Sequence, residues 1–272
     1  MTHASLFSGI GGFDLAAEWA GWTNVFNCEI DKFCQNVLRY HFPNAIQYED
    51  IKSTDFAIHR GGVDVLTGGF PCQPFSLAGK RRGSDDNRYL WPEMLRAIRE
   101  IQPRWVVGEN VYGIVNWSDG MVFEQVQSDL EDAGYEVQPF LIPACAVDAP
   151  HRRVRVWFIA RRNDVTDALR ERGREGTTEV KSKFAEWDGA DGVSDEWQDS
   201  RVPDWESFPT QSPVCSRDDG ISSRLDSISF PRWRRESIKA YGNAVVPQVV
   251  LQIFETIKEY ENEIQTEIPD TR

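Results

Sequence analysis

The sequence has few of the residues that build disulfide frameworks and metal clusters. Its 272 residues include only five cysteines and four histidines. The cysteines are odd in number and scattered without a Cys-x-x-Cys pair, which argues against a disulfide framework or a zinc cluster and fits a reducing compartment. His41 and His59 fall in no ligand spacing, so we expect no metal site.

Long apolar runs are also absent. No stretch approaches the roughly 20 residues that cross a bilayer, so we expect no membrane partner. Asp14 and Glu18 interrupt the apolar residues after Met1, which is not the pattern of a signal peptide. The hydrophobic content of 40% is ordinary for a globular chain. We therefore expect a cytoplasmic monomer with one substantial core.

The first segment resembles a nucleotide-cofactor site but lacks the usual phosphate signatures. Residues 4–7 predict a strand, Ser8-Gly9-Ile10-Gly11-Gly12 a glycine-rich turn, and residues 13–20 a helix. Glycine lets the backbone approach a ligand closely. The segment contains neither Gly-x-Gly-x-x-Gly nor a Lys-Ser/Thr pair, so a bound pyrophosphate is not expected. A cofactor loop and a purely structural turn both remain open.

Acidic residues follow the next two predicted strands. Residues 25–28 predict a strand closed by Glu29, and residues 46–51 predict another that ends at Asp50 and Ile51. An acid after the second strand of such a fold can accept hydrogen bonds from ribose hydroxyls. Glu29 could equally cap the helix predicted over residues 31–40. Two acids in these positions are the layout expected around an adenosine.

The stretch Gly68-Gly69-Phe70-Pro71-Cys72-Gln73-Pro74-Phe75-Ser76 is central to the chain. It follows residues 63–67, which predict a buried parallel strand. Two prolines make the turn around Cys72 stiff, at the carboxyl end of a strand where open α/β sheets bind ligands. A lone cysteine is often a small core residue. The polar, basic segment 79–88 instead favours an exposed nucleophile.

Further charged residues follow later strands. A helix is predicted over residues 91–101 and a strand over 104–107, so Glu109 lies after a buried strand, where desolvation would raise its pKa. It could also be a solvated surface glutamate. Residues 150–159 alternate as a strand, which places Arg153 and Arg155 on one face. They are either solvated or directed at a substrate oxygen or phosphate.

The remaining chain divides by composition. A helix over 122–133 and a strand over 136–142 precede a mixed-charge segment, and a tight turn over 241–248 leads into a C-terminal helix that Pro247 begins. We predict a catalytic and cofactor-binding domain at 1–162, a short variable region at 163–237, and a returning segment at 238–272. The net charge of −13 argues weakly against nucleic acid, but basic clusters at 80–82, 152–162 and 232–239 offset it locally.

Five motifs together resemble the DNA (cytosine-5) methyltransferase family. Residues 7–13 resemble its S-adenosylmethionine loop, Pro71-Cys72-Gln73 its nucleophile motif, and Glu109-Asn110-Val111 its acid motif. Arg153-Val154-Arg155 is similar to its paired arginines, and residues 242–247 to its closing motif. The motifs occur in the family's order. Pro150-His151 departs from the usual Pro-Gln, and no segment between 209 and 237 resembles the motif that supports target recognition.

The resemblance implies a fold and a cofactor. The fold would be α/β, a Rossmann-like methyltransferase fold with a mostly parallel sheet and a small irregular target-recognition lobe. S-adenosylmethionine would lie with its adenine ring against Phe7 and its ribose on Glu29. Its adenine amino group would donate to Asp50. The implied cofactor-binding residues are Phe7, Ser8, Gly9, Ile10, Gly11, Gly12, Glu29, Ile30, Asp50, Ile51, Gly69, Pro71, Leu90, Asn243 and Ala244.

The resemblance also implies a chemistry on duplex DNA. Cys72 would add to C6 of a flipped-out cytosine, Glu109 would supply a proton at N3, Arg155 would hold O2, and Arg153 would order the loop and Glu109. The implied DNA-binding residues are Gln73, Ser76, Lys80, Arg82, Arg88 and Arg232. A cognate restriction endonuclease could accompany the enzyme, or none. The alternatives are a tRNA cytosine-5 methyltransferase of the same family, an inactive DNA- or cofactor-binding relative, and a dinucleotide oxidoreductase.

Overall fold

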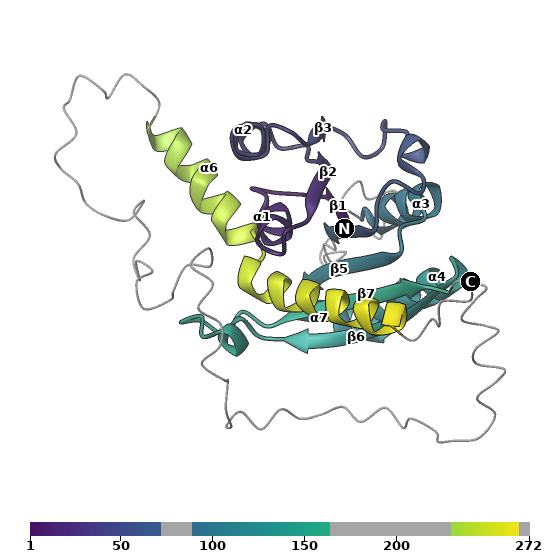
Figure 1. The fold of residues 1–272 in the computed structure, drawn as a ribbon. Helices are drawn as coiled ribbons and strands as arrows, with labels where there is room; N and C mark the ends of the chain where they lie inside the picture. Colours follow the sequence, from purple (N-terminus) through teal and green to yellow (C-terminus); the bar gives the residue numbers. More distant parts are fainter. Residues whose placement is uncertain (72–88, 164–229, 267–272) are drawn as a thin grey trace, which may run out of the picture.

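The computed structural model describes residues 1–71, 89–163 and 230–266. Its centre is a seven-stranded sheet with the order β3-β2-β1-β4-β5-β7-β6 (Figure 1). Strands β1 to β5 are parallel to one another, whereas β7 runs antiparallel between β5 and β6. The strands are β1 Thr2–Leu6, β2 Thr23–Cys28, β3 Ile46–Tyr48, β4 Val65–Gly69, β5 Trp105–Val111, β6 Tyr135–Ile142 and β7 Arg155–Arg162.

Helices cover both faces of the sheet, which confirms the predicted Rossmann-like α/β fold. The α-helices are α1 Gly12–Trp19, α2 Lys32–His41, α3 Trp91–Ile101, α4 Met121–Asp132, α6 Phe230–Asn243 and α7 Pro247–Thr266. Short 3₁₀ segments are η1 Ala57–His59, η2 Tyr112–Val115, η3 Trp117–Gly120 and η4 Ala144–Val147. Within the described ranges, no helix combines the length and apolar character that crossing a membrane requires.

Neighbouring strand residues alternate between two cores, one on each side of the sheet. Val107 and Trp157 face the core formed with α1 and α7, whereas Val106 and Phe158 face the core formed with α3 and α4. Figure 1 shows α7 next to α1, although the two helices lie at opposite ends of the chain. Trp22, in the turn between α1 and β2, stacks on Phe254 of α7 with ring centroids 4.4 Å apart. The C-terminal segment is therefore part of the core.

Helix α3 illustrates how the sequence specifies an element. Its buried residues recur at helical spacing, as Trp91, Met94, Leu95, Ile98 and Ile101 show. Pro92 lies in its first turn, where a missing N–H costs nothing. The helix ends at Ile101, and its C-cap Gln102 has a left-handed φ of 52°. The predicted bounds of 91–101 are confirmed.

Several predicted boundaries were wrong. Strand β3 ends at Tyr48, so Asp50 and Ile51 lie in a turn. Strand β7 begins only at Arg155, because Arg153 has a φ of 31° and interrupts the extended chain. Residues 241–243 belong to α6, so the predicted tight turn shortens to residues 244–246. Strand β5 continues to Val111, so Glu109 lies inside it.

The predicted division into three regions stays a prediction. Helix α6 crosses the predicted boundary between residues 237 and 238. Residues 164–229, which hold most of the variable region and the predicted recognition lobe, lie outside the described residues.

Candidate active site

The glycine-rich turn after β1 is shaped by close approaches. Gly11 has a φ of 87°, and a Cβ there would lie 2.4 Å from the ring of Phe42. A Cβ on Gly12 would lie 2.7 Å from the side chain of Val245. Both positions therefore require glycine. The second contact links the turn to the segment between α6 and α7.

The side chain of Ser8 joins β1 to β2. Its hydroxyl accepts a hydrogen bond from the Cys28 amide at 3.1 Å and lies 2.6 Å from the Ser5 hydroxyl. Ser5 in turn donates to the fully buried Asp14, at 2.9 Å. Burial raises the pKa of Asp14 to about 7. This buried polar group lies beneath the turn and was not predicted as a site.

Glu29 holds the glycine-rich turn from the end of β2. One carboxylate oxygen accepts a hydrogen bond from the Gly9 amide at 2.7 Å, and the other accepts one from the Asp31 amide at 2.8 Å. Asp31, not Glu29, is the N-cap of α2, where its side chain accepts from the Phe33 amide at 2.9 Å. The alternative of Glu29 as the helix cap is therefore wrong.

A hollow of about 290 Å³ opens beside this turn. Six predicted cofactor residues line it, namely Phe7, Ser8, Gly9, Gly69, Asn243 and Ala244, together with Phe13, Glu109 and Val245. The other predicted cofactor residues lie outside this lining: Ile10, Gly11, Gly12, Glu29, Ile30, Asp50, Ile51, Pro71 and Leu90. Ile51 is buried, whereas Ile30 is 69% exposed. The hollow therefore joins both ends of the chain at the carboxyl edge of β1 and β4, where the strand order reverses.

Glu109 lines both this hollow and a second one beside it. It lies opposite Gly69 of β4 on one side and Trp157 of β7 on the other. Its carboxylate accepts from Arg155 Nε at 2.9 Å, and only 12% of its side chain is exposed. Burial raises the pKa of Glu109 above its usual value, and the positive charges of Arg155 and Arg153 reduce that rise. The group can therefore hold a proton more readily than a surface glutamate.

Arg153 connects the same site to the C-terminal segment. Its guanidinium donates to the carbonyl oxygens of Gly242 at 2.9 Å and Ala244 at 2.6 Å. Burial, together with the charge of Arg155, lowers the pKa of Arg153. These carbonyl partners, about 90 residues away along the chain, were not predicted.

A second hollow, of about 210 Å³, is lined by Glu109, Arg153, Arg155, Trp157 and Val245, with Ile142, Ala144, Val246 and Val249. Glu109 and Val245 also line the first hollow. The two hollows are therefore adjacent, with the carboxylate of Glu109 common to both. Trp157 lies on the same face, and its indole N–H has no partner among the described residues.

Asn110 fixes the chain where the cysteine segment begins. Its amide nitrogen donates to the Phe70 carbonyl at 3.0 Å, and its side-chain oxygen accepts from the Val111 amide at 2.9 Å. The Leu90 amide lies 3.4 Å from the Pro71 carbonyl, so the two ends of the intervening segment are close together. No role was predicted for Asn110, although it belongs to the Glu109-Asn110-Val111 motif.

The predicted nucleophile Cys72 lies outside the described residues. So do the predicted DNA-binding residues Gln73, Ser76, Lys80, Arg82 and Arg88, and the side chain of Arg232. Across residues 1–71, 89–163 and 230–266, no group of three or more histidine, cysteine or acidic side chains could hold a metal ion.

Comparisons with known proteins point to one protein family. The family model for C-5 cytosine-specific DNA methylase matches residues 1–204. The type II methyltransferase M.Eco47II of Escherichia coli is 39% identical over 62% of this chain and 41% of its own length. The type II methyltransferase M.PspPI of Psychrobacter is 41% identical over 60% of this chain and 40% of its own length.

A solved structure supports the fold. A mutant of Spodoptera frugiperda DNMT2 superposes with a TM-score of 0.52 and 26% identity, over 61% of this chain and 51% of that chain. The alignments to the two curated relatives span less than half of their length.

Proposed function

The chain belongs to the C-5 cytosine-specific DNA methylase family, and from this premise we propose that it methylates C5 of cytosine in duplex DNA. The observation that carries the proposal is the Glu109–Arg155 pair. The pair is largely buried, and its member Glu109 lies opposite Gly69 and lines both hollows. The next residue, Asn110, holds the Phe70 carbonyl, two residues before Cys72.

S-adenosylmethionine would lie in the first hollow, with its adenine against Phe7. Glu29 and Asp50, which lie outside the lining, would accept hydrogen bonds from the ribose hydroxyls and the adenine amino group. Gly69, Pro71 and Leu90 would line the methionine end, with Asn243 and Ala244 above it. When bound, this cofactor supplies an electrophilic methyl group. The protein's part is to hold that group near the second hollow.

Cys72 is the proposed nucleophile. Cys28 and Cys34 are buried, and burial raises the pKa of each thiol to about 12, so neither supplies a thiolate near neutral pH. Attack of the Cys72 thiolate on C6 forms the S–C6 bond and moves the ring electrons toward N3 and C5. C5 would then form its bond to the methyl group as the bond from that carbon to the donor's sulfonium sulfur breaks, which leaves a neutral thioether. Loss of the C5 proton to a base releases Cys72 by β-elimination.

Glu109 and its arginine neighbours would stabilise this addition. Protonated Glu109 donates to N3 as negative charge develops there, which the raised pKa of Glu109 favours. Arg155, already 2.9 Å from Glu109, would also hold the O2 oxygen of the base. Arg153 keeps the 242–244 segment in place through its two carbonyl contacts. The contacts of Glu109 and Arg155 to the base would strengthen as charge develops in the transition state, which is the requirement for catalysis.

DNA would reach the site with its target base flipped out of the stack. Gln73, Ser76, Lys80, Arg82, Arg88 and Arg232 would contact the DNA backbone and the flipped strand. Residues 163–237 would read the target sequence, because the remaining segments serve catalysis and the cofactor. The type II names of the relatives raise a cognate restriction endonuclease as a functional companion.

The direct test is methyl transfer from tritium-labelled S-adenosylmethionine to duplex DNA and, in parallel, to tRNA. Label should enter DNA only, and bisulfite sequencing should place it at C5 of cytosine in one sequence context. Cys72→Ser should abolish incorporation, whereas Cys145→Ser, at the exposed cysteine outside both hollows, should not. Label in tRNA alone, or methylation at another base position, would contradict the proposal.

A further inference from the structure

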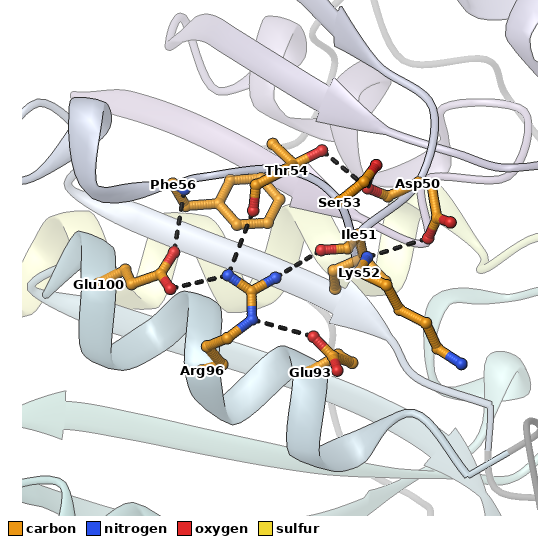
Figure 2. A network of polar contacts seen from close by, with 9 residues as sticks. All are labelled: Asp50, Ile51, Lys52, Ser53, Thr54, Phe56, Glu93, Arg96 and Glu100. Atoms are coloured by element: carbon orange, nitrogen blue, oxygen red, sulfur yellow. Dashed lines mark hydrogen bonds and ion pairs between the residues drawn. The ribbon is translucent and has the colours of Figure 1, made fainter.

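One arginine of α3 connects that helix to the turn that carries Asp50. Figure 2 shows Arg96 reaching from α3 to the segment between Asp50 and Phe56. Its guanidinium donates to the Ile51 carbonyl at 2.5 Å and to the Thr54 carbonyl at 3.2 Å. The segment between those carbonyls has no helix or strand of its own. Arg96 therefore supplies hydrogen bonds that regular structure would otherwise provide.

Two glutamates of the same helix hold the guanidinium in place. Glu93 lies 2.9 Å from Arg96 Nε, and Glu100 lies 2.7 Å from Nη1. The other oxygen of Glu100 accepts from the Phe56 amide at 2.9 Å. Figure 2 shows this network between one helix and one turn. The planar guanidinium of Arg96 contacts two carboxylates and two carbonyls at once, which a lysine ammonium cannot reproduce.

The turn is internally ordered but needs an external attachment. The Asp50 carboxylate accepts from the Lys52 amide at 2.9 Å, and the Asp50 carbonyl accepts from Thr54 Oγ1 at 2.8 Å. These bonds fix the shape of the turn and not its position. The contacts of Arg96 and Glu100 attach the turn to α3, which begins next to Leu90 at the other side of the proposed cofactor site.

We propose that Arg96 is a positioning residue for cofactor recognition: it holds the Asp50 turn where the carboxylate of Asp50 accepts from the adenine amino group. This inference rests on the proposed function, because it takes Asp50 as the adenine contact. The adenine side of the site is then aligned with α3, and through Leu90 with the methionine side.

The test is calorimetric titration with S-adenosylhomocysteine, which is not consumed, and with an analogue that carries hydrogen in place of the 6-amino group. Arg96→Gln should weaken binding of S-adenosylhomocysteine about tenfold and leave binding of the analogue unchanged within twofold. Arg96→Lys keeps the charge between Glu93 and Glu100, so it should fold and show a smaller loss with the same selectivity. Thermal melts check that each variant is folded.

Arg60→Gln is the matched control. Arg60, which follows η1, also contacts the C-terminal end of α3. It donates to Gln102 Oε1 at 3.0 Å and to the Arg99 carbonyl at 3.3 Å, and not to the Asp50 turn. It should bind both compounds as the wild type does. Equal losses for both compounds in the Arg96 variants would show a purely structural role and overturn the inference. Wild-type affinity in both folded Arg96 variants would also overturn it.

Asp50→Ala, which removes the acceptor, separates this inference from the proposed function. If Asp50→Ala weakens binding of S-adenosylhomocysteine and the Arg96 variants do not, only the inference fails. If Asp50→Ala binds as the wild type does, the adenine contact is wrong, and the inference fails with it. If the wild type itself does not bind S-adenosylhomocysteine, the proposed cofactor is wrong.

Discussion

Glu29 and Glu109 lie at the same edge of the sheet, yet the protein prepares them differently. Glu29 is half-buried and accepts two backbone amides, from Gly9 and Asp31. Glu109 has 12% of its side chain exposed, is paired with Arg155, and has a pKa that burial raises. The first carboxylate is fixed as an acceptor and the second can hold a proton. Position after a strand therefore does not decide a glutamate's chemistry, but its partners do.

The strongest test of this difference is Glu109→Gln. Glutamine keeps the shape but cannot deliver a proton, so kcat should fall by about 10²–10³, as for loss of one preorganised donor. The affinity for DNA should stay unchanged, which a gel-shift assay would check. In the wild type kcat/KM should fall as pH rises through the raised pKa of Glu109, and the variant should lose that dependence. An unchanged kcat would remove Glu109 from the mechanism.

Asp14 extends the comparison to a third carboxyl group, which is fully buried and whose side-chain partner is a hydroxyl and not an arginine. Its pKa of about 7 in the folded state exceeds the ordinary 3.8, so the folded protein keeps a proton that the unfolded chain releases. Stability should therefore fall as pH rises from about 4 to about 7. Relative to Asp14→Asn, the wild type should lose on the order of 2 kcal/mol between pH 5 and 7.5.

Urea denaturation of both proteins at the two pH values measures this difference. The effect of His3, whose pKa burial lowers to about 4, is common to both proteins and cancels. A difference in stability that does not change with pH would mean that Asp14 is ionised throughout.

The smallest effect is expected for Glu29→Gln. Its amide oxygen still accepts one backbone N–H, but the charge that would bind ribose hydroxyls is lost. Affinity for S-adenosylhomocysteine should fall about tenfold, or roughly 1.4 kcal/mol, by calorimetry. Its kcat at saturating cofactor should change little, in contrast to Glu109→Gln. If the variant and the wild type bind S-adenosylhomocysteine equally well, the role of Glu29 is only structural, through its contacts to Gly9 and Asp31.

Local sequence patterns predicted much of the fold but few of the contacts between residues far apart in the sequence. The bounds of α3 followed from apolar spacing and Pro92, and the strand–turn–helix at Gly12 from its glycines. The start of β7 did not, because the positive φ of Arg153 is not encoded in alternation. The contact of Gly12 with Val245 and the bonds of Arg153 to Gly242 and Ala244 depend on tertiary packing.

The candidate site was predicted in its residue types more than in its partners. Glu109 and Arg155 were each expected to carry a role, but their pairing at 2.9 Å required the register of β5 against β7. Asn110 was part of a quoted motif, and its bond to Phe70 crosses from β5 to the end of β4. The Arg96 network joins a helix to a turn about 40 residues earlier, a separation at which no sequence periodicity operates.

The most direct measurement is covalent trapping on duplex DNA that carries 5-fluorocytosine at the target. Fluorine cannot leave C5 as a cation, so methyl transfer should leave the enzyme attached at C6 and give a complex that survives denaturing electrophoresis. Cys72→Ser should form none, and Glu109→Gln should form it far more slowly while still binding DNA. A denaturation-resistant complex with Cys72→Ser, or efficient methylation of ordinary DNA by that variant, would contradict the proposed covalent mechanism.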